Sequence, residues 1–326
     1  MLRWAYDRLV GTPTRHKLPS EGPDSSSGSH EPMSGYGDMP VASLAERIRG
    51  DVDLLSDLPT AVVVRLAATL GRDDVEVAVI ERIICQDPVV TGKVIHAANA
   101  AAYASHTPTS SIRSALLRLG VVRVRRLALL FGLYNAPPGS KVPEGFWRHS
   151  LAVANLTEVV LRHVTVEEGS VDADSVFLAG LLHDLGLLVL ATHYPSEYRA
   201  LREAAHLQGK SLDEVEDALL GTHHGSIGER LAAHWMLPAP VCAAIRAHHR
   251  IDLSETEYRQ EALVVHVAEA ACGHAELADI GEGVMLREGE PALVELGISP
   301  EGLGAIVAEA QVEAEWAAEL IGGFGR

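Results

Sequence analysis

An adjacent histidine and aspartate stand inside one of the most apolar stretches of the chain. The segment Leu178–Leu190 reads LAGLLHDLGLLVL, and its only polar side chains are those of His183 and Asp184. Burying a polar group without a partner is costly, and burying a lone charge costs more. The pair therefore needs compensation, and a bound metal ion is one candidate.

Other polar residues lie on apolar stripes at helical spacing. Residues three and four apart share one face of a helix. His149 is three residues after Phe146 and four before Val153, so we expect it to point inward with them. The same spacing predicts inward positions for His224, three before Ile227; for His248 and His249, three and four after Ile245; and for Glu269, four after Val265.

One buried histidine is usually a core residue satisfied by a hydrogen bond, but so many inward polar groups are expensive unless they meet. Neutral imidazoles and carboxylates suit first-row divalent metals. We therefore expect one pocket for divalent ions such as Fe, Mn or Zn, with Asp184 bridging two of them. The expected ligands are His149, His183, Asp184, His224, His248, His249 and Glu269.

The remaining histidines serve as controls. His223 and His266 adjoin candidate ligands, and we expect them to form hydrogen bonds around the site. A second set lies near helix ends or polar faces, or too far from the site, and is interpreted as structural or exposed: His163, His193, His206, His234 and His274.

The elements that must position these residues are expected to be helices. The chain is 47% hydrophobic with 5% aromatic residues, and helical periodicity runs through most of it. We predict an all-α, two-lobed fold. Its expected parts are a short helix over 1–11, a Ser/Gly/Pro-rich flexible linker over 12–40, an N-terminal helical lobe over 41–140, and a second helical lobe with a C-terminal extension over 141–326.

Composition excludes several classes of function. A net charge of −17 makes nucleic-acid binding unlikely, because phosphates need a basic face. The arginines at 113, 118, 123, 125 and 126 are interpreted as the solvated face of amphipathic helices. Three scattered cysteines fit a reducing cytoplasm. The apolar run around His183 is too short for a membrane span, so none is expected.

The order and spacing of the candidate residues resemble the HD superfamily of metal-dependent phosphohydrolases. His149, His183-Asp184, His224, His248-His249 and an acid at 269 follow its pattern. The segments ICQDPVVTGKVIHAANAAAY, SIRSALLRLG and HHGSIGERLAAHWMLPAPVCAAIRAHH resemble the HDOD family, the HD-related output domains of bacterial signalling proteins. The resemblance covers roughly residues 45–275 and implies that the second lobe is HD-like.

Two functions follow from this resemblance. The first is a bacterial regulatory module that acts through a signalling protein partner, with or without a retained metal site. The alternative is a metal-dependent phosphohydrolase or phosphodiesterase acting on a nucleotide or cyclic nucleotide, with Asp184 as its central catalytic residue. Glu269 stands where HD enzymes usually have aspartate. No Gly-Tyr-Pro segment follows His249, which argues against cyclic-di-GMP as substrate.

Overall fold

The computed structural model describes residue 48 and residues 61–69, 75–99, 109–134, 145–165, 171–254, 256–274 and 290–322. Within these ranges every regular element is a helix, so the all-α prediction is confirmed. The predicted helix over 1–11, the predicted linker over 12–40 and the expected lobe boundary at residues 140–141 lie outside the described residues.

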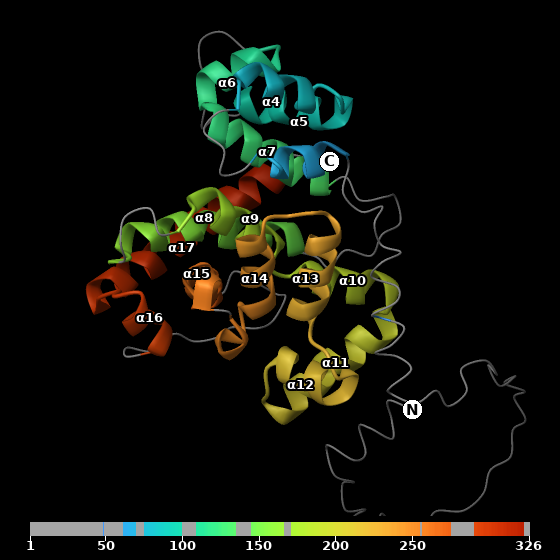
Figure 1. Cartoon of the computed structure of the whole chain (residues 1–326), viewed down its shortest axis with the longest axis vertical. Helices are drawn as coiled ribbons and strands as arrows, with labels where there is room; N and C mark the ends of the chain where they lie inside the picture. Colours follow the sequence, from blue (N-terminus) through green and yellow to red (C-terminus); the bar gives the residue numbers. More distant parts are fainter. Residues whose placement is uncertain are drawn as a thin grey trace, which may run out of the picture.

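The first group of helices gathers at one end of the molecule (Figure 1). It comprises α3 (Ala61–Ala67), α4 (Val77–Ile84), α5 (Pro88–Asn99), α6 (Ile112–Leu119) and α7 (Val121–Tyr134). Helix α7 packs against α3, α4, α5 and α6 and so forms the centre of this lobe. Pro88 begins α5, a position where its missing N–H and fixed φ cost nothing.

The second group carries the candidate site. It comprises α8 (Phe146–His163), α9 (Ala173–Leu182), α10 (Leu185–His193), α11 (Pro195–Gln208), α12 (Leu212–Leu220), α13 (His224–His234), α14 (Ala239–Ala247), the short 3₁₀ helices η3 (Ile251–Leu253) and η4 (Thr256–Tyr258), α15 (Arg259–His274), α16 (Pro291–Glu295) and α17 (Pro300–Gly322). Helix α8 packs against α9, α15 and α17, and α14 packs against α9, α13 and α15. Helices α11 and α12 lie at the end of the molecule away from the first group (Figure 1).

The apolar segment around His183 does not form one continuous helix. Helix α9 ends at Leu182 and α10 begins at Leu185, so His183 and Asp184 form the turn between them. The His183 Nδ1–H donates to the Gly180 carbonyl at 2.8 Å. In a continuous helix that carbonyl would accept from the Asp184 N–H, so the side chain competes with the helical ladder at this point.

The expectation of no membrane span rested on too short a segment. Residues Ala173–His193 cover 21 residues and contain an 18-residue window with a mean hydropathy of 1.8, which suffices by length and composition alone. However, 94% of that window is buried inside the protein. It therefore has the surroundings of a core element of a globular fold.

One arginine expected at the surface is buried. Arg125 on α7 is 5% exposed, and its guanidinium donates to Thr69 O at 3.1 Å and forms an ion pair with Asp174 at the start of α9. The interpretation of Arg125 as a solvated residue is wrong because its side chain faces the second lobe, where Asp174 is its counter-ion. Arg126 beside it also pairs with Asp174, at 3.2 Å, and with Glu158.

Candidate metal centre

Four helices and one interhelical turn bring all the predicted site residues into one buried region. His149 comes from the first half of α8, His183-Asp184 from the α9–α10 turn, and His224 from the first position of α13. His248 and His249 directly follow α14, and Glu269 lies within α15. Their side chains are only 0–6% exposed. Five of the seven residues lie at or just beyond a helix end: His183, Asp184, His224, His248 and His249. At such positions side chains from neighbouring helices can meet.

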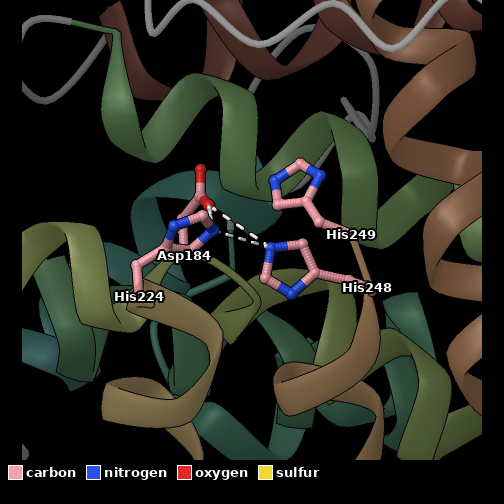
Figure 2. A group of neighbouring side chains, drawn as sticks. All are labelled: Asp184, His224, His248 and His249. Atoms are coloured by element: carbon pink, nitrogen blue, oxygen red, sulfur yellow. Dashed lines mark hydrogen bonds and ion pairs between the residues drawn. The ribbon is translucent and has the colours of Figure 1, made fainter. Parts of the chain in front are cut away.

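The donor atoms form two groups. The first consists of Asp184, His224, His248 and His249, whose candidate ligand atoms all lie within 4.8 Å of one another. Figure 2 shows the rings of His224 and His248 turned toward the Asp184 carboxylate, with His249 close by. The Nε2 atoms of His224 and His248 are 3.1 Å apart.

The second group consists of His149, His183 and Glu269, again with ligand atoms within 4.8 Å of one another. The Nε2 atoms of His149 and His183 are 3.1 Å apart, and His183 Nε2 is 4.0 Å from Glu269 Oε1. The same Glu269 oxygen is 3.2 Å from His249 Nε2, so this carboxylate lies between the two groups.

The Asp184 carboxylate also connects the groups, with one oxygen directed to each. Its Oδ2 is 3.2 Å from His183 Nε2 and 3.6 Å from His149 Nε2. Its Oδ1 is 3.8 Å from Nε2 of both His224 and His248. This is the arrangement of a carboxylate that could bridge two cations.

Hydrogen bonds at the far side of three imidazoles determine which nitrogen faces the site. A carbonyl or carboxylate oxygen only accepts, so Nδ1 must carry the proton in each ring. His183 donates to Gly180 O at 2.8 Å, His248 to Ile245 O at 2.6 Å, and His224 to Glu216 Oε2 at 2.7 Å. The Nε2 atoms of His224 and His248 then face each other at 3.1 Å, so both are placed to ligate one cation.

Two buried carboxylate oxygens support the same interpretation. Among the described residues, Asp184 Oδ1 and Glu269 Oε2 have no hydrogen-bond partner. A buried acceptor without a partner loses its hydrogen bonds to water and gains none from the protein. Orphaned carboxylate oxygens beside imidazole nitrogens form a donor set that fits a divalent ion of the Fe, Mn or Zn type.

The pKa values of the metal-free groups show how strongly these charges interact. Burial and the neighbouring His183 lower the pKa of His149 to about 4. Burial opposes charge on His183, yet the Asp184 carboxylate and its hydrogen bond raise the His183 pKa to about 9. Burial raises the pKa of Glu269 to about 8. Burial works against ionised Asp184 as well, but His183 holds the Asp184 pKa well below its ordinary value.

Glu216 on α12 is a site residue that the sequence reasoning missed. Its side chain has no exposed surface, and its Oε2 accepts from both the backbone N–H and the Nδ1–H of His224, each at 2.7 Å. A signal was present in the pattern, because Glu216 shares the apolar stripe of Leu212, Val215 and Leu219. A carboxylate behind a ligating histidine orients the ring and raises its basicity.

The control histidines separate as expected. His266 Nδ1 donates to His248 O at 2.6 Å and so supports the turn that carries a predicted ligand. His223 caps the start of α13, and its ring bonds to Ser226 Oγ at 2.9 Å instead of joining either group. His193, His206 and His234 are exposed, and His163 packs near Gly302 at the far end of α8.

Comparison with known proteins identifies one domain family in this chain. A model of the HDOD domain matches residues 55–251, more than half of the chain. An uncharacterized protein of Treponema pallidum (strain Nichols) is 25% identical over 225 residues, which is 67% of this chain but only 41% of that relative. The chain thus aligns to less than half of that protein's length.

Solved structures share the fold. An HDOD domain protein of unknown function from Geobacter sulfurreducens is 27% identical with a TM-score of 0.71, covering 86% of this chain and 97% of that one. A protein of Shewanella amazonensis SB2B, provisionally named a phosphohydrolase, is 20% identical with a TM-score of 0.65, covering 84% of this chain and 97% of its own. A provisional signal transduction protein of Marinobacter aquaeolei VT8 is 19% identical with a TM-score of 0.72, covering 87% and 67%. With the family model spanning both lobes and the histidine-rich segments between α8 and α14, the chain belongs to the HDOD family.

Proposed function

We propose that this protein is a bacterial, cytoplasmic signalling module that acts by binding a protein partner and contains a divalent metal centre with a structural role. The observation that carries the proposal is the burial of the donor set: the side chains concerned are 0–6% exposed although they converge from four helices and the turn between α9 and α10. A centre closed on all sides by its own helices resembles structural metal sites, in which the protein supplies the ligands.

Family membership supports the signalling part of this proposal. HDOD domains resemble HD enzymes in fold and are usually regulatory, and one structural relative is named a signal transduction protein. In such a module the metal would hold α8, α10, α13, α14 and α15 in one arrangement, which fixes the surface offered to a partner.

The test is metal analysis of the purified chain, with melting temperatures measured before and after chelation. We expect a divalent metal to co-purify or to load, and chelation to lower the melting temperature. Asp184→Asn should remove most of the metal while Asp252→Asn, an exposed change in η3, should not. If no metal can be loaded and chelator leaves the melting temperature unchanged, the structural-metal proposal is wrong.

A second function is favoured by one specific observation, the orientation of the Asp184 carboxylate. Its two oxygens face two separate groups of donors, as a bridge between two ions would. Paired ions lower the pKa of water and polarise phosphate oxygens. In this case Asp184, with His149, His183, His224, His248, His249 and Glu269, would hold the ions and the protein would hydrolyse a phosphomonoester or phosphodiester, with a nucleotide as substrate.

The two functions differ in what they require of the site. Hydrolysis needs a path for phosphate to the buried donors, whereas a structural centre needs none. Incubating the manganese-loaded protein with bis(p-nitrophenyl) phosphate and p-nitrophenyl phosphate distinguishes them. Turnover that Asp184→Asn abolishes would establish the enzyme. Metal-dependent stability without turnover would leave the signalling module.

A further inference from the structure

A cavity of about 500 Å³ lies at the junction of the two groups of helices, outside the candidate metal centre. Residues from the end of α6, from α7, and from α8, α9 and α17 form its wall. In Figure 1 these helices meet in the upper middle of the molecule. The volume is within the range of pockets that hold small organic molecules, which typically enclose about 300–1,000 Å³.

Four apolar side chains of the wall are buried. Leu127 and Leu130 of α7, Leu151 of α8 and Phe177 of α9 line it, and each is at most 3% exposed. Val122 also lines the cavity and is 45% exposed, so the wall reaches solvent at this residue. A ligand would therefore bury an apolar body against α7, α8 and α9 and enter past Val122.

Two arginines, Arg123 and Arg126, line the cavity, and Arg126 is held by protein groups. The Arg126 guanidinium lies 4.2 Å from the centre of the Phe177 ring and is bound by Asp174, at 3.2 Å, and by Glu158. Arg126 thus acts as a fixed part of the wall that covers one aromatic face. Its charge is balanced by protein carboxylates, so it offers little to an anionic ligand.

The polar group most suited to a ligand is the Glu313 carboxylate of α17. It lines the cavity opposite α7, is hydrogen-bonded to Asn155 of α8, and is half-buried. Its carboxylate neighbours Glu158 and Glu309 repel it, whereas Arg162 is bound to Glu309. Burial and these like charges raise the pKa of Glu313. A cation at this point would relieve both effects.

From this arrangement we propose that the cavity binds a small amphipathic amine, with its apolar body between Leu127, Leu151 and Phe177 and its ammonium group on Glu313. The site is separate from the metal centre. Leu151, Asn155 and Glu158 lie on one face of α8, spaced by four and three residues. His149 is two residues from Leu151 and so points to roughly the opposite side of the helix.

Three probes with one apolar body test the proposal: 4-phenylbutylamine, 4-phenylbutanol and 4-phenylbutyrate. Each would be titrated into the full chain by calorimetry, with and without chelator. We expect saturable binding of the amine, weaker binding of the alcohol and none of the acid, whether or not metal is present. Glu313→Gln should weaken amine binding about tenfold and leave the alcohol unaffected, as expected for loss of a charge-assisted bond.

A second pair of variants guards against effects on folding. Val122→Trp should fill the opening and abolish binding of both amine and alcohol, because the position lines the cavity and is partly exposed. Leu117→Trp is the matched control on α6, 85% exposed and outside the cavity wall, and should bind like wild type. Absence of saturable amine binding, tighter binding of the acid than of the amine, or binding that survives Val122→Trp would each overturn the proposal.

Discussion

Glu216 bonds twice to a single histidine from a position with no exposed surface. It fixes both the backbone and the ring of His224 at the point where α13 begins, so the Nε2 lone pair faces Asp184. Backbone carbonyls do the same for His183 and His248. At the scale of single residues, the site is therefore oriented before any ion is bound, which lowers the cost of binding one.

Glu216→Gln should lower metal affinity by about 10- to 100-fold, because loss of the carboxylate weakens both the orientation and the basicity of His224. Competition titration with a chromogenic zinc chelator would measure the change. Glu203→Gln, an exposed change on α11, is the control and should bind metal like wild type. Equal affinities in the two variants would contradict a role for Glu216 in positioning His224.

The metal-free protein should lose stability as pH rises from 6.5 to 9. Folding raises the His183 pKa from 6.5 to about 9, so that contribution is complete below pH 6.5 and lost as pH passes 9. Folding raises the Glu269 pKa from 4.5 to about 8, so between these pH values the native state retains a proton that the unfolded chain releases. Stability therefore falls as pH rises from 4.5 to 8. His149, with its lowered pKa, has the opposite effect, but only below pH 6.5.

Melting temperatures of chelated and metal-loaded protein at pH 6.5 and 9 check this prediction. The loaded form should lose less stability, since metal binding requires deprotonated ligands and gains from high pH. A chelated protein whose melting temperature rises over this interval would show that the His183–Asp184 pair and Glu269 are not protonated in the way described.

Close contact between helices is what brings the ligands together at the scale of elements. A Cβ added at Gly186 of α10 would lie 2.0 Å from the His224 carbonyl oxygen. One added at Gly228 of α13 would lie 2.9 Å from Ile245 Cγ2, and one at Gly225 would lie 2.6 Å from Arg246 O. Helices α10, α13 and α14 can approach so closely only because these three positions have no side chain.

Gly186→Ala should therefore destabilise the fold by about 3 kcal/mol or more, because the added methyl group meets backbone and cannot be accommodated by a rotamer change. It should also weaken metal binding by displacing His224. Chemical denaturation and metal titration measure the two effects. Gly304→Ala on α17 is the control, because its added Cβ meets nothing within 4 Å. That change should be neutral or stabilise the helix by up to about 1 kcal/mol.

The two groups of helices are joined by a charge cluster at the scale of the whole molecule. Arg125 and Arg126 of α7 both bind Asp174 in the first turn of α9, and Arg125 also reaches Thr69 O. Helix α9 ends one residue before His183. A displacement of the first lobe would thus pull directly on the helix that leads into the candidate metal centre.

Asp174→Asn should cost about 3 kcal/mol, because it leaves the buried Arg125 guanidinium without its main counter-ion. Urea denaturation followed by circular dichroism would measure the change. Arg113→Met is the matched control: it breaks the pair with Glu81, 3.6 Å apart, in which Arg113 is 72% exposed. That loss should stay below about 1 kcal/mol. Similar values for the two variants would mean that the cluster adds little to the connection between lobes.

Local periodicity predicted the helical class of the fold and the inward positions of His149, His224, His248, His249 and Glu269, because spacings of three and four residues indicate which helix face is buried. His183 and Asp184 were identified by their apolar surroundings. His149 and Glu269 were identified by this rule alone, and the structure brings them together with the others. Their role as metal ligands stays a prediction, as do the lobe boundaries.

Tertiary structure decided what depends on partners distant in the chain. The break at His183-Asp184, the burial of Arg125 beside Asp174, and the cavity between α7, α8, α9 and α17 all arise where separate helices meet. Glu216 was marked by its apolar stripe, but only the fold shows that it bonds to His224. Periodicity reports which side of a helix is covered. It does not report what covers it, because the partners come from segments whose relative placement is a property of the whole chain.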